Sequence, residues 1–306
     1  MPTKWPNGLI RCAYFDLMCC CDRHDISGSA ATINSWVAEK TDNKITELVP
    51  ENDIDSLTRL ILVNAVYFKG NWLKTFHPID TRDRNFYLSE KKTIRVDMMY
   101  KNAEFYYGVS EELKCQAVEL PYDGDTLSMF VLLPDRSATN LSELEKKLTS
   151  DDLINVTKKF RMASSDVHLS LPKFRLDEKL SLAESLSGMG MKDLFTESVA
   201  DLSGIDGTKN LYVSKVLHRA VVDVNEEGTE AAAAISGQLV FCSFNEDEPP
   251  QIYFNADRPF LFFIQDKATG AILFLGRLTK PPASSRTRNA KTSQRRGIFK
   301  KCCIIA

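Results

Sequence analysis

The chain has 306 residues, of which 43% are hydrophobic and 26% are charged; it is long enough for one large or two smaller domains, and the composition excludes a disordered chain. Its formal net charge of -2 gives no overall attraction to nucleic acid or to anionic membranes. The N-terminus lacks the basic and apolar pattern of a signal peptide, and no segment has the roughly 18 consecutive apolar residues that a membrane-spanning helix needs. We therefore expect a soluble protein.

Most of the eight cysteines lie near the two ends of the chain, which is not the pattern of a disulfide framework. Adjacent cysteines are poorly placed to bridge one another, and no nearby His/Cys quartet has the spacing of a zinc site. We therefore expect free thiols in a reducing compartment, with no metal and no cofactor. The cysteines are Cys12, Cys19, Cys20, Cys21, Cys115, Cys242, Cys302 and Cys303.

The first predicted element is an amphipathic helix that begins after Thr32, which would serve as its N-cap. The apolar positions Ile33, Trp36 and Val37 follow helical spacing, and Pro50 closes the unit.

The apolar run 60–68 is rich in β-branched and aromatic residues, so it predicts a central strand covered on both faces. Asn64 lies in the middle of this run. A buried amide without hydrogen-bond partners costs about 1 to 3 kcal/mol, so Asn64 indicates a polar network inside the core.

The remaining elements mix strands and helices without a repeating strand-helix alternation, which predicts an α+β fold. Two stretches show helical spacing, and the second is broken at Gly188 and Gly190; they are 141–148 and 180–195. The further predicted strands are 115–123, 126–134, 166–176, 211–225, 259–266 and 271–278. The first two are joined by the turn "DGD" at 123–125, and the last two form a hairpin around Lys267 to Gly270.

Six segments between residues 33 and 281 occur in one characteristic order. They are "INSWVAEKTDNKI", "LVNAVYFKGNW", "LPYDGDTLSMFVLLP", "LPKF", "VLHRAVVDVNEEGTEAAAA" and "FNADRPFLFFIQDKATGAILFLGRLTKP". Together they resemble the serpin family of serine protease inhibitors, in its ovalbumin-like branch. The resemblance implies an α+β serpin-like fold with large sheets, packed helices and an exposed reactive-centre loop at about 228–250.

The resemblance also implies suicide inhibition. A protease attacks the loop and forms its acyl-enzyme, and the loop then inserts as a new strand into the large sheet of a metastable protein. The composition suits such a segment, because alternation from Thr229 places Ala231, Ala233 and Ile235 on one face, without charge or proline there as far as Phe241. Gly228 lets the hinge backbone turn. The hinge residues are Glu226, Glu227, Gly228, Thr229, Glu230, Ala231, Ala232, Ala233 and Ala234.

The family's usual spacing from Gly228 places the reactive bond at Cys242–Ser243, although the longer loop leaves Leu239, Phe241 and Phe244 open as cleavage positions. No Arg or Lys lies between positions 230 and 257, which speaks against trypsin-like targets. We expect a chymotrypsin-like, elastase-like or papain-like cysteine protease as the partner, and no nucleic acid. Cys242 would also make the bait sensitive to oxidation.

Asn64 and His218 match the family positions of a polar latch (the shutter), and Trp72 matches the tryptophan where the loop enters the sheet (the breach). His218 stands in an apolar alternating strand, so we expect a hydrogen-bonded core histidine rather than a catalytic base. No other histidine has a neighbouring Ser or Cys motif that would complete a triad. We therefore expect an inhibitor, with no catalytic residues, and not an enzyme.

Both ends depart from the family pattern. Residues 1–32 stand where serpins carry several helices and two strands, so we expect an N-terminally truncated serpin domain over 33–281 with an unpaired edge beside Asn64. Residues 282–306 form a basic tail that we expect to be disordered. Its last four residues fit prenylation of Cys303, which would place a monomeric inhibitor on a membrane.

Two alternatives stay open at this stage. The chain is either a working inhibitor or a non-inhibitory, folding-defective fragment or splice variant that acts at most as a binding protein. The family resemblance favours the extracellular space, whereas the absence of a signal peptide favours the cytoplasm.

Overall fold

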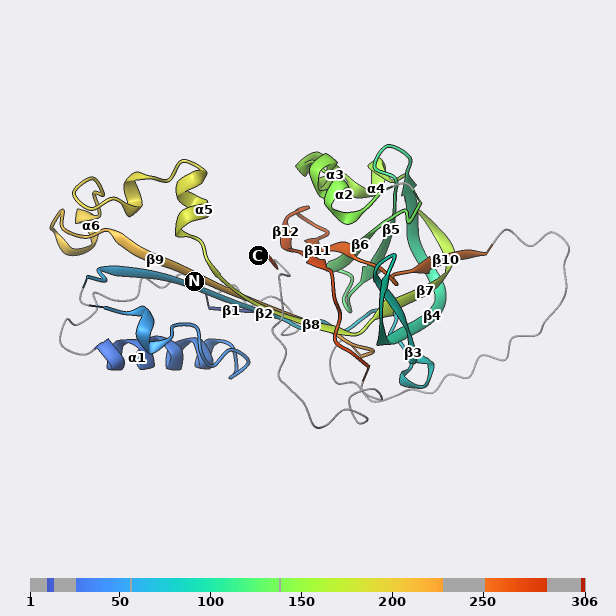
Figure 1. Ribbon diagram of the computed structural model, residues 1–306, viewed down its shortest axis with the longest axis horizontal. Coiled ribbons are helices and arrows are strands. Elements are labelled where there is room, and N and C mark those ends of the chain that lie inside the picture. Colours follow the sequence, from blue (N-terminus) through green and yellow to red (C-terminus); the bar gives the residue numbers. More distant parts are fainter. Residues whose placement is uncertain are drawn as a thin grey trace, which may run out of the picture. The chain divides into compact units, whose positions relative to one another are not determined.

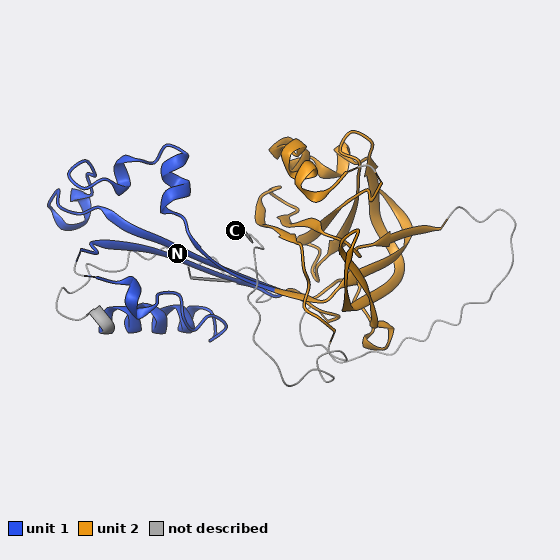
Figure 2. Ribbon diagram, viewed as in Figure 1, with its two compact units in different colours: residues 1–69, 176–222 blue, residues 70–175, 223–306 orange. Residues whose placement is uncertain are grey.

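The computed structural model describes residues 10–13, 26–55, 57–137, 139–227, 251–284 and 304–305. The chain divides into two compact units, residues 1–69 with 176–222 (unit 1) and residues 70–175 with 223–306 (unit 2), as Figure 2 shows. Helices and strands are mixed without regular alternation, which confirms the predicted α+β class. No described helix is long and apolar enough to cross a membrane.

Unit 1 is built on a four-stranded sheet with the order β1-β2-β9-β8 (Figure 1). Its strands are β1 (Ile10–Ala13), β2 (Leu60–Phe68), β9 (Val213–Val224) and β8 (Phe174–Ser181). The central pair, β2 and β9, is parallel. The helical segments of this unit are α1 (Ile26–Lys40), η2 (Glu51–Asp53), α5 (Ala183–Gly188), η4 (Asp193–Phe195) and α6 (Ser203–Asp206).

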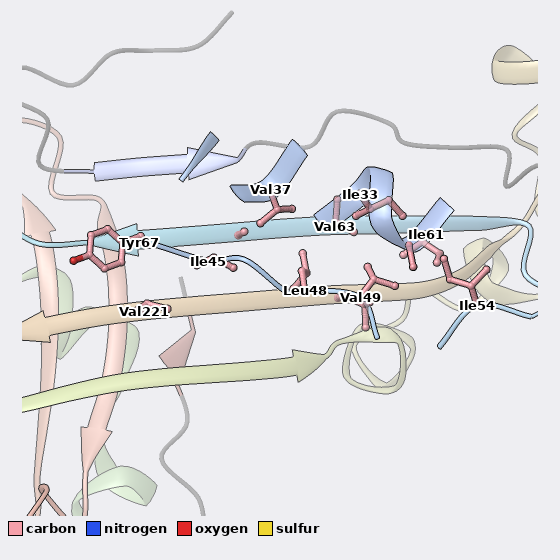
Figure 3. Packing of buried hydrophobic residues seen from close by; sticks show 13 residues of the cluster. Ile33, Val37, Ile45, Leu48, Val49, Ile54, Ile61, Val63, Tyr67 and Val221 are labelled. Carbon is pink, nitrogen blue, oxygen red and sulfur yellow. The ribbon is translucent and has the colours of Figure 1, made fainter. Parts of the chain in front are cut away.

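Helix α1 supplies the main core of unit 1. Ile33 and Val37 lie one turn apart on the helix and form one buried cluster with Ile61 and Val63 of β2 (Figure 3). Burial of each such side chain stabilises the fold by about 1.5 to 3 kcal/mol. The helix and the strand therefore depend on each other for a shared apolar face.

The predicted start of this helix after Thr32 is wrong, because the helix begins at Ile26. Thr32 lies inside the helix, and its hydroxyl donates a hydrogen bond to the Gly28 carbonyl at 2.8 Å. A threonine can satisfy its hydroxyl on the carbonyl four residues earlier, so its presence alone does not mark a cap.

The predicted unpaired edge of β2 is half covered. Strand β1 pairs antiparallel with β2 from Ala65 to Phe68, whereas no described strand pairs with that edge between Leu60 and Asn64. Within the described residues the expected unpaired edge is therefore present from Leu60 to Asn64 and is covered by β1 from Ala65 onward.

Unit 2 is built on a nine-stranded sheet with the order β10-β7-β4-β5-β6-β11-β12-β13, and β3 pairs with β4 off this path. Its strands are β3 (Arg82–Ser89), β4 (Lys92–Ser110), β5 (Cys115–Pro121), β6 (Leu127–Pro134), β7 (Ala163–Pro172), β10 (Ile252–Asn255), β11 (Phe260–Asp266), β12 (Ile272–Leu278) and β13 (Ile304–Ile305). Its helical segments are η3 (Pro78–Asp80), α2 (Leu141–Lys147), α3 (Ser150–Ile154) and α4 (Val156–Lys159).

The predicted hairpins of unit 2 are confirmed, since β5 pairs with β6 and β11 pairs with β12. Gly270 takes the positive φ of 73° that the second turn requires. The predicted strand 166–176 is divided, because β7 ends at Pro172 in one sheet and β8 begins at Phe174 in the other. The apolar alternation changes phase at Lys173, from Leu169 and Leu171 before it to Phe174 and Leu176 after it, and this change marks the passage from one sheet to the other.

The structure describes residues 282–284 and 304–305 of the tail, and the predicted disorder of its other residues lies outside the described part of the chain. Ser284 is fully buried; its backbone N–H donates to the Arg95 carbonyl at 2.9 Å, and its hydroxyl donates to Asp97 Oδ1 at 2.7 Å. Strand β13 pairs antiparallel with β12. Cys303 lies outside the described residues, so its predicted prenylation stays untested.

Candidate functional site

The predicted loop follows β9 of the four-stranded sheet in the sequence and precedes β10 of the nine-stranded sheet (Figure 1). Residues 228–250 between them lie outside the described residues. The predicted hinge positions 228–234 and the predicted bond Cys242–Ser243 therefore fall in that segment. The first two hinge residues, Glu226 and Glu227, are described and define the base of the loop.

Glu226 is held by contacts on both its side chain and its backbone. One carboxylate oxygen accepts a hydrogen bond from the Thr81 hydroxyl at 2.8 Å, and the other lies 2.6 Å from Nζ of Lys173. The Glu226 carbonyl accepts a bond from the Phe76 N–H at 2.9 Å. The residue is only 8% exposed, so these partners replace water for a buried charge.

The ionisation of Glu226 reflects two opposed effects. Burial alone would raise the pKa of its carboxyl, but the hydrogen bonds from Lys173 and Thr81 outweigh burial and hold that pKa below its ordinary value. The carboxylate is therefore charged at neutral pH, as the ion pair with Lys173 requires.

Trp72 holds the neighbouring residue of the base. Its indole Nε1 donates a hydrogen bond to the Asn225 carbonyl at 2.8 Å. The indole is stacked on Tyr122, with ring centroids 4.5 Å apart, and meets Phe76 edge-on at 6.4 Å. Stacking fixes the direction of the indole N–H, so Trp72 positions the backbone from which the loop departs.

We call the set that holds residues 225 and 226 the clamp. Its members all belong to unit 2 and combine an ion pair, three further hydrogen bonds and an aromatic stack. They are Trp72, Phe76, Thr81, Tyr122 and Lys173, together with Glu226 itself. The clamp fixes the N-terminal end of the loop while the rest of the loop follows from position 228.

The centre of the β2–β9 pair has a different character. Asn64 and His218 lie directly opposite each other in the parallel register. His218 is 3% exposed, and burial lowers its pKa below the ordinary histidine value, so its ring is neutral at pH 7. Asn64 Oδ1 and His218 Nε2 have no hydrogen-bond partner among the described residues.

Such atoms are costly in a buried position, at about 1 to 3 kcal/mol each. The two residues are brought together as neighbours, as expected, but the satisfied polar network predicted around them is not observed in the described part of the chain. A strand that entered between β2 and β9 would separate these two residues and offer their polar atoms new partners.

Comparison with known proteins places this geometry in a family. The family model "Serpin (serine protease inhibitor)" matches residues 18–281, which is more than half of the chain. The chain belongs to the serpin family. The match begins ahead of Ile33, the first residue of the sequence motifs.

The serpin is 44% identical over 262 residues to human leukocyte elastase inhibitor, with 85% of this chain and 68% of that protein covered. It is 47% identical over 253 residues to the bovine leukocyte elastase inhibitor, covering 82% and 66%. These relatives support the ovalbumin-like branch predicted from the motifs and protease inhibition as the family function.

Solved structures agree on the fold. Uncleaved ovalbumin superimposes with a TM-score of 0.74 at 34% identity, covering 85% of this serpin and 64% of that chain. Native protease nexin-1 with heparin gives a TM-score of 0.71 at 34% identity, covering 85% and 67%. The chain thus spans about two thirds of the length of the proteins that it matches.

Sequence reasoning located Trp72 and Glu226 in this serpin but missed Lys173 and Thr81. Lys173 stands in the quoted "LPKF" segment, yet nothing nearby indicates a buried carboxylate partner, because that partner lies 53 positions further along the chain. Cys115 is buried, and burial raises the pKa of its thiol to about 12, so it is an inert core residue.

Proposed function

We propose that this chain inhibits a protease as a suicide substrate, with the loop after Glu227 as the bait. The observation that carries the proposal is the combination of a clamped loop base with a parallel β2–β9 pair in which Asn64 Oδ1 and His218 Nε2 have no hydrogen-bond partner among the described residues. One feature holds an end of the loop, and the other leaves a place where a new strand improves the bonding.

Strand direction supports insertion. A chain that leaves the C-terminal end of β9 and folds back runs antiparallel to β9, and therefore also antiparallel to β2. Antiparallel ladders are slightly more stable per residue than parallel ones. Replacing one parallel contact by two antiparallel ladders supplies the driving force for the transition.

The reaction needs no catalytic group from the inhibitor. The protease nucleophile attacks the carbonyl carbon of the reactive bond, the peptide C–N bond breaks, and the new amine leaves with the C-terminal side of the loop. The N-terminal side stays bound to the protease as an ester or thioester. Insertion of that side carries the protease away from the loop's original position before water completes hydrolysis.

The described histidines support a role as inhibitor rather than enzyme. His77 accepts a hydrogen bond from the Ile79 N–H, and His168 shares one with the Tyr100 hydroxyl. Neither is paired with a nucleophilic Ser or Cys in the described parts of the chain. We accordingly propose that the chain has no hydrolytic activity of its own.

The target class follows from the bait. Cys242 and Phe241 suit the apolar pockets of chymotrypsin-like, elastase-like or papain-like proteases, and the loop has no basic residue for a trypsin-like pocket. The relatives named as leukocyte elastase inhibitors favour an elastase-like target.

The test is incubation of the chain with leukocyte elastase and, separately, with chymotrypsin, followed by a denaturing gel and a residual-activity assay. We expect a band of summed mass that survives denaturation, together with loss of protease activity. Cleavage of the loop without that band would support the alternative, a non-inhibitory serpin-like binding protein. Trypsin serves as the negative control.

A further inference from the structure

Ser284 lies where one edge of β4 changes its partner. Strand β7 pairs with β4 as far as its last residue, Pro172, and Lys173 then donates its backbone N–H to the Asp97 carbonyl at 2.9 Å. The Ser284 N–H donates to the Arg95 carbonyl, also at 2.9 Å. Carbonyls two residues apart in a strand point to the same edge, so Ser284 continues the edge that β7 leaves.

The Ser284 side chain binds the same strand a second time. Its hydroxyl donates to Asp97 Oδ1 at 2.7 Å, and the residue is fully buried. A hydrogen bond to a carboxylate is stronger than one between neutral groups, and burial strengthens it further. Ser284 therefore holds β4 through the Arg95 backbone and the Asp97 side chain together.

A second carboxylate lies directly opposite Asp97, which adds to the value of this donor. In the register of β3 and β4, Asp97 faces Asp83. Like charges at directly opposed positions destabilise a sheet. Oδ2 of Asp83 lies 3.1 Å from Nη2 of Arg95, and Oδ1 of Asp97 accepts the Ser284 hydroxyl. The Ser284 contact thus helps the strand pair to hold two opposed charges.

Asp97 connects the Ser284 contact to the clamp. Its side chain is bound by Ser284, while its carbonyl accepts the N–H of Lys173, whose Nζ lies 2.6 Å from Glu226. Three successive contacts therefore lead from Ser284 to the loop base, and all of them lie within unit 2. A shift of the β4 backbone at Asp97 would move the residue that supplies the cation to Glu226.

The contact belongs to the part of the chain beyond the family region, because the serpin match ends at residue 281. We propose that Ser284 is a positioning residue of the clamp, so that the start of the tail determines how firmly the loop base is held and how efficiently the cleaved loop inserts. The effect on insertion rests on the proposed function. A fixed base shortens the search of the cleaved loop for the sheet, in competition with hydrolysis of the ester.

The first test is a double-mutant cycle on the full chain, and it does not depend on inhibition. Ser284→Ala should raise the equilibrium constant of unfolding, measured in urea, about tenfold, because a hydrogen bond to a carboxylate is lost. In the Lys173→Met background the same change should raise that constant only about threefold, because part of its effect passes through Lys173.

Ser128→Ala is the matched control for the cycle. Ser128 is also fully buried in unit 2, and its hydroxyl donates to Glu119 Oε1 at 2.7 Å. Its replacement should raise the equilibrium constant by the same factor with and without Lys173→Met. Factors for Ser284→Ala that agree within about twofold in the two backgrounds overturn the positioning role.

The second test measures how many moles of chain inactivate one mole of leukocyte elastase. Ser284→Ala should raise this ratio about threefold, because slower insertion lets more ester hydrolyse, whereas Ser128→Ala should leave it unchanged. An equal ratio for Ser284→Ala and the unaltered chain overturns the effect on insertion. Absence of a covalent complex with the unaltered chain rejects suicide inhibition, and the cycle then still supports or overturns the positioning of the clamp by Ser284.

Discussion

The clamp at the loop base and the centre of the β2–β9 pair handle buried polar groups in opposite ways. In the clamp, the carboxylate of Glu226 has a partner for each oxygen. Between β2 and β9, Asn64 Oδ1 and His218 Nε2 have none among the described residues. Fully paired buried groups rigidify a site, whereas unpaired ones mark a place where another arrangement can be more stable. The difference separates the part that should stay fixed from the part that should open.

The largest loss of stability is expected when the clamp is broken by replacing Lys173. Lys173→Met leaves the Glu226 carboxylate buried without its cation and should lower the free energy of unfolding by about 2 kcal/mol. This is less than the roughly 3 to 5 kcal/mol of a fully buried pair, because the Lys173 side chain is 37% exposed. Urea unfolding followed by circular dichroism measures the change.

Two matched variants decide whether the ion pair itself is responsible. Lys173→Arg keeps the charge and should retain most of the stability, and Lys173→Met/Glu226→Gln removes both charges and should recover part of the loss. Equal stability of Lys173→Met and the unaltered chain would show that the clamp does not hold the loop base.

A smaller effect is expected from Trp72→Phe. The ring that stacks on Tyr122 is kept in part, but the donor to the Asn225 carbonyl is lost, which should cost about 1 kcal/mol. Trp36→Phe is the control, because Trp36 packs only partly against the core of unit 1. If Trp36→Phe lowers the free energy of unfolding as much as Trp72→Phe does, the indole hydrogen bond does not stabilise the loop base.

The smallest predicted effect is a loss of stability at low pH, and it arises at His218 in the β2–β9 pair. Because the folded-state pKa of His218 lies below its unfolded value, the stability that its neutral form contributes is complete above about pH 6.5 and is lost as pH falls through the folded-state pKa. Thermal unfolding at pH 7.5 and pH 5.5 should therefore show a lower melting temperature at the lower pH. His218→Gln should reduce this difference, and an unchanged difference would assign it to other groups.

Sequence reasoning succeeded where one local pattern determines the structure. The run 60–68 and the two hairpins of unit 2 were predicted because continuous apolar strands and glycine turns are local signals. The long strands β3 and β4 were not predicted, since their charged and apolar residues follow no single period. The start of α1 was placed seven residues late, because Thr32 has the side chain of a cap but bonds within the helix.

The site was predictable only in part for a related reason. Trp72 and Glu226 were found through family motifs, but their partners lie far away along the chain and carry no local signal. The pairing of Lys173 with Glu226 arises from the fold, which brings the end of β7 beside the end of β9. The opposed carboxylates Asp83 and Asp97 likewise become visible only once the register of β3 and β4 is known.

The central claim is that the loop inserts between β2 and β9 after cleavage, and one measurement tests it most directly. The melting temperature of the purified chain is recorded before and after limited cleavage of the loop by chymotrypsin. We predict a large rise on cleavage, because the inserted strand gains two antiparallel ladders and pairs the centre of the sheet. An unchanged melting temperature with a fully cleaved loop would contradict insertion, and with it the proposed mechanism of inhibition.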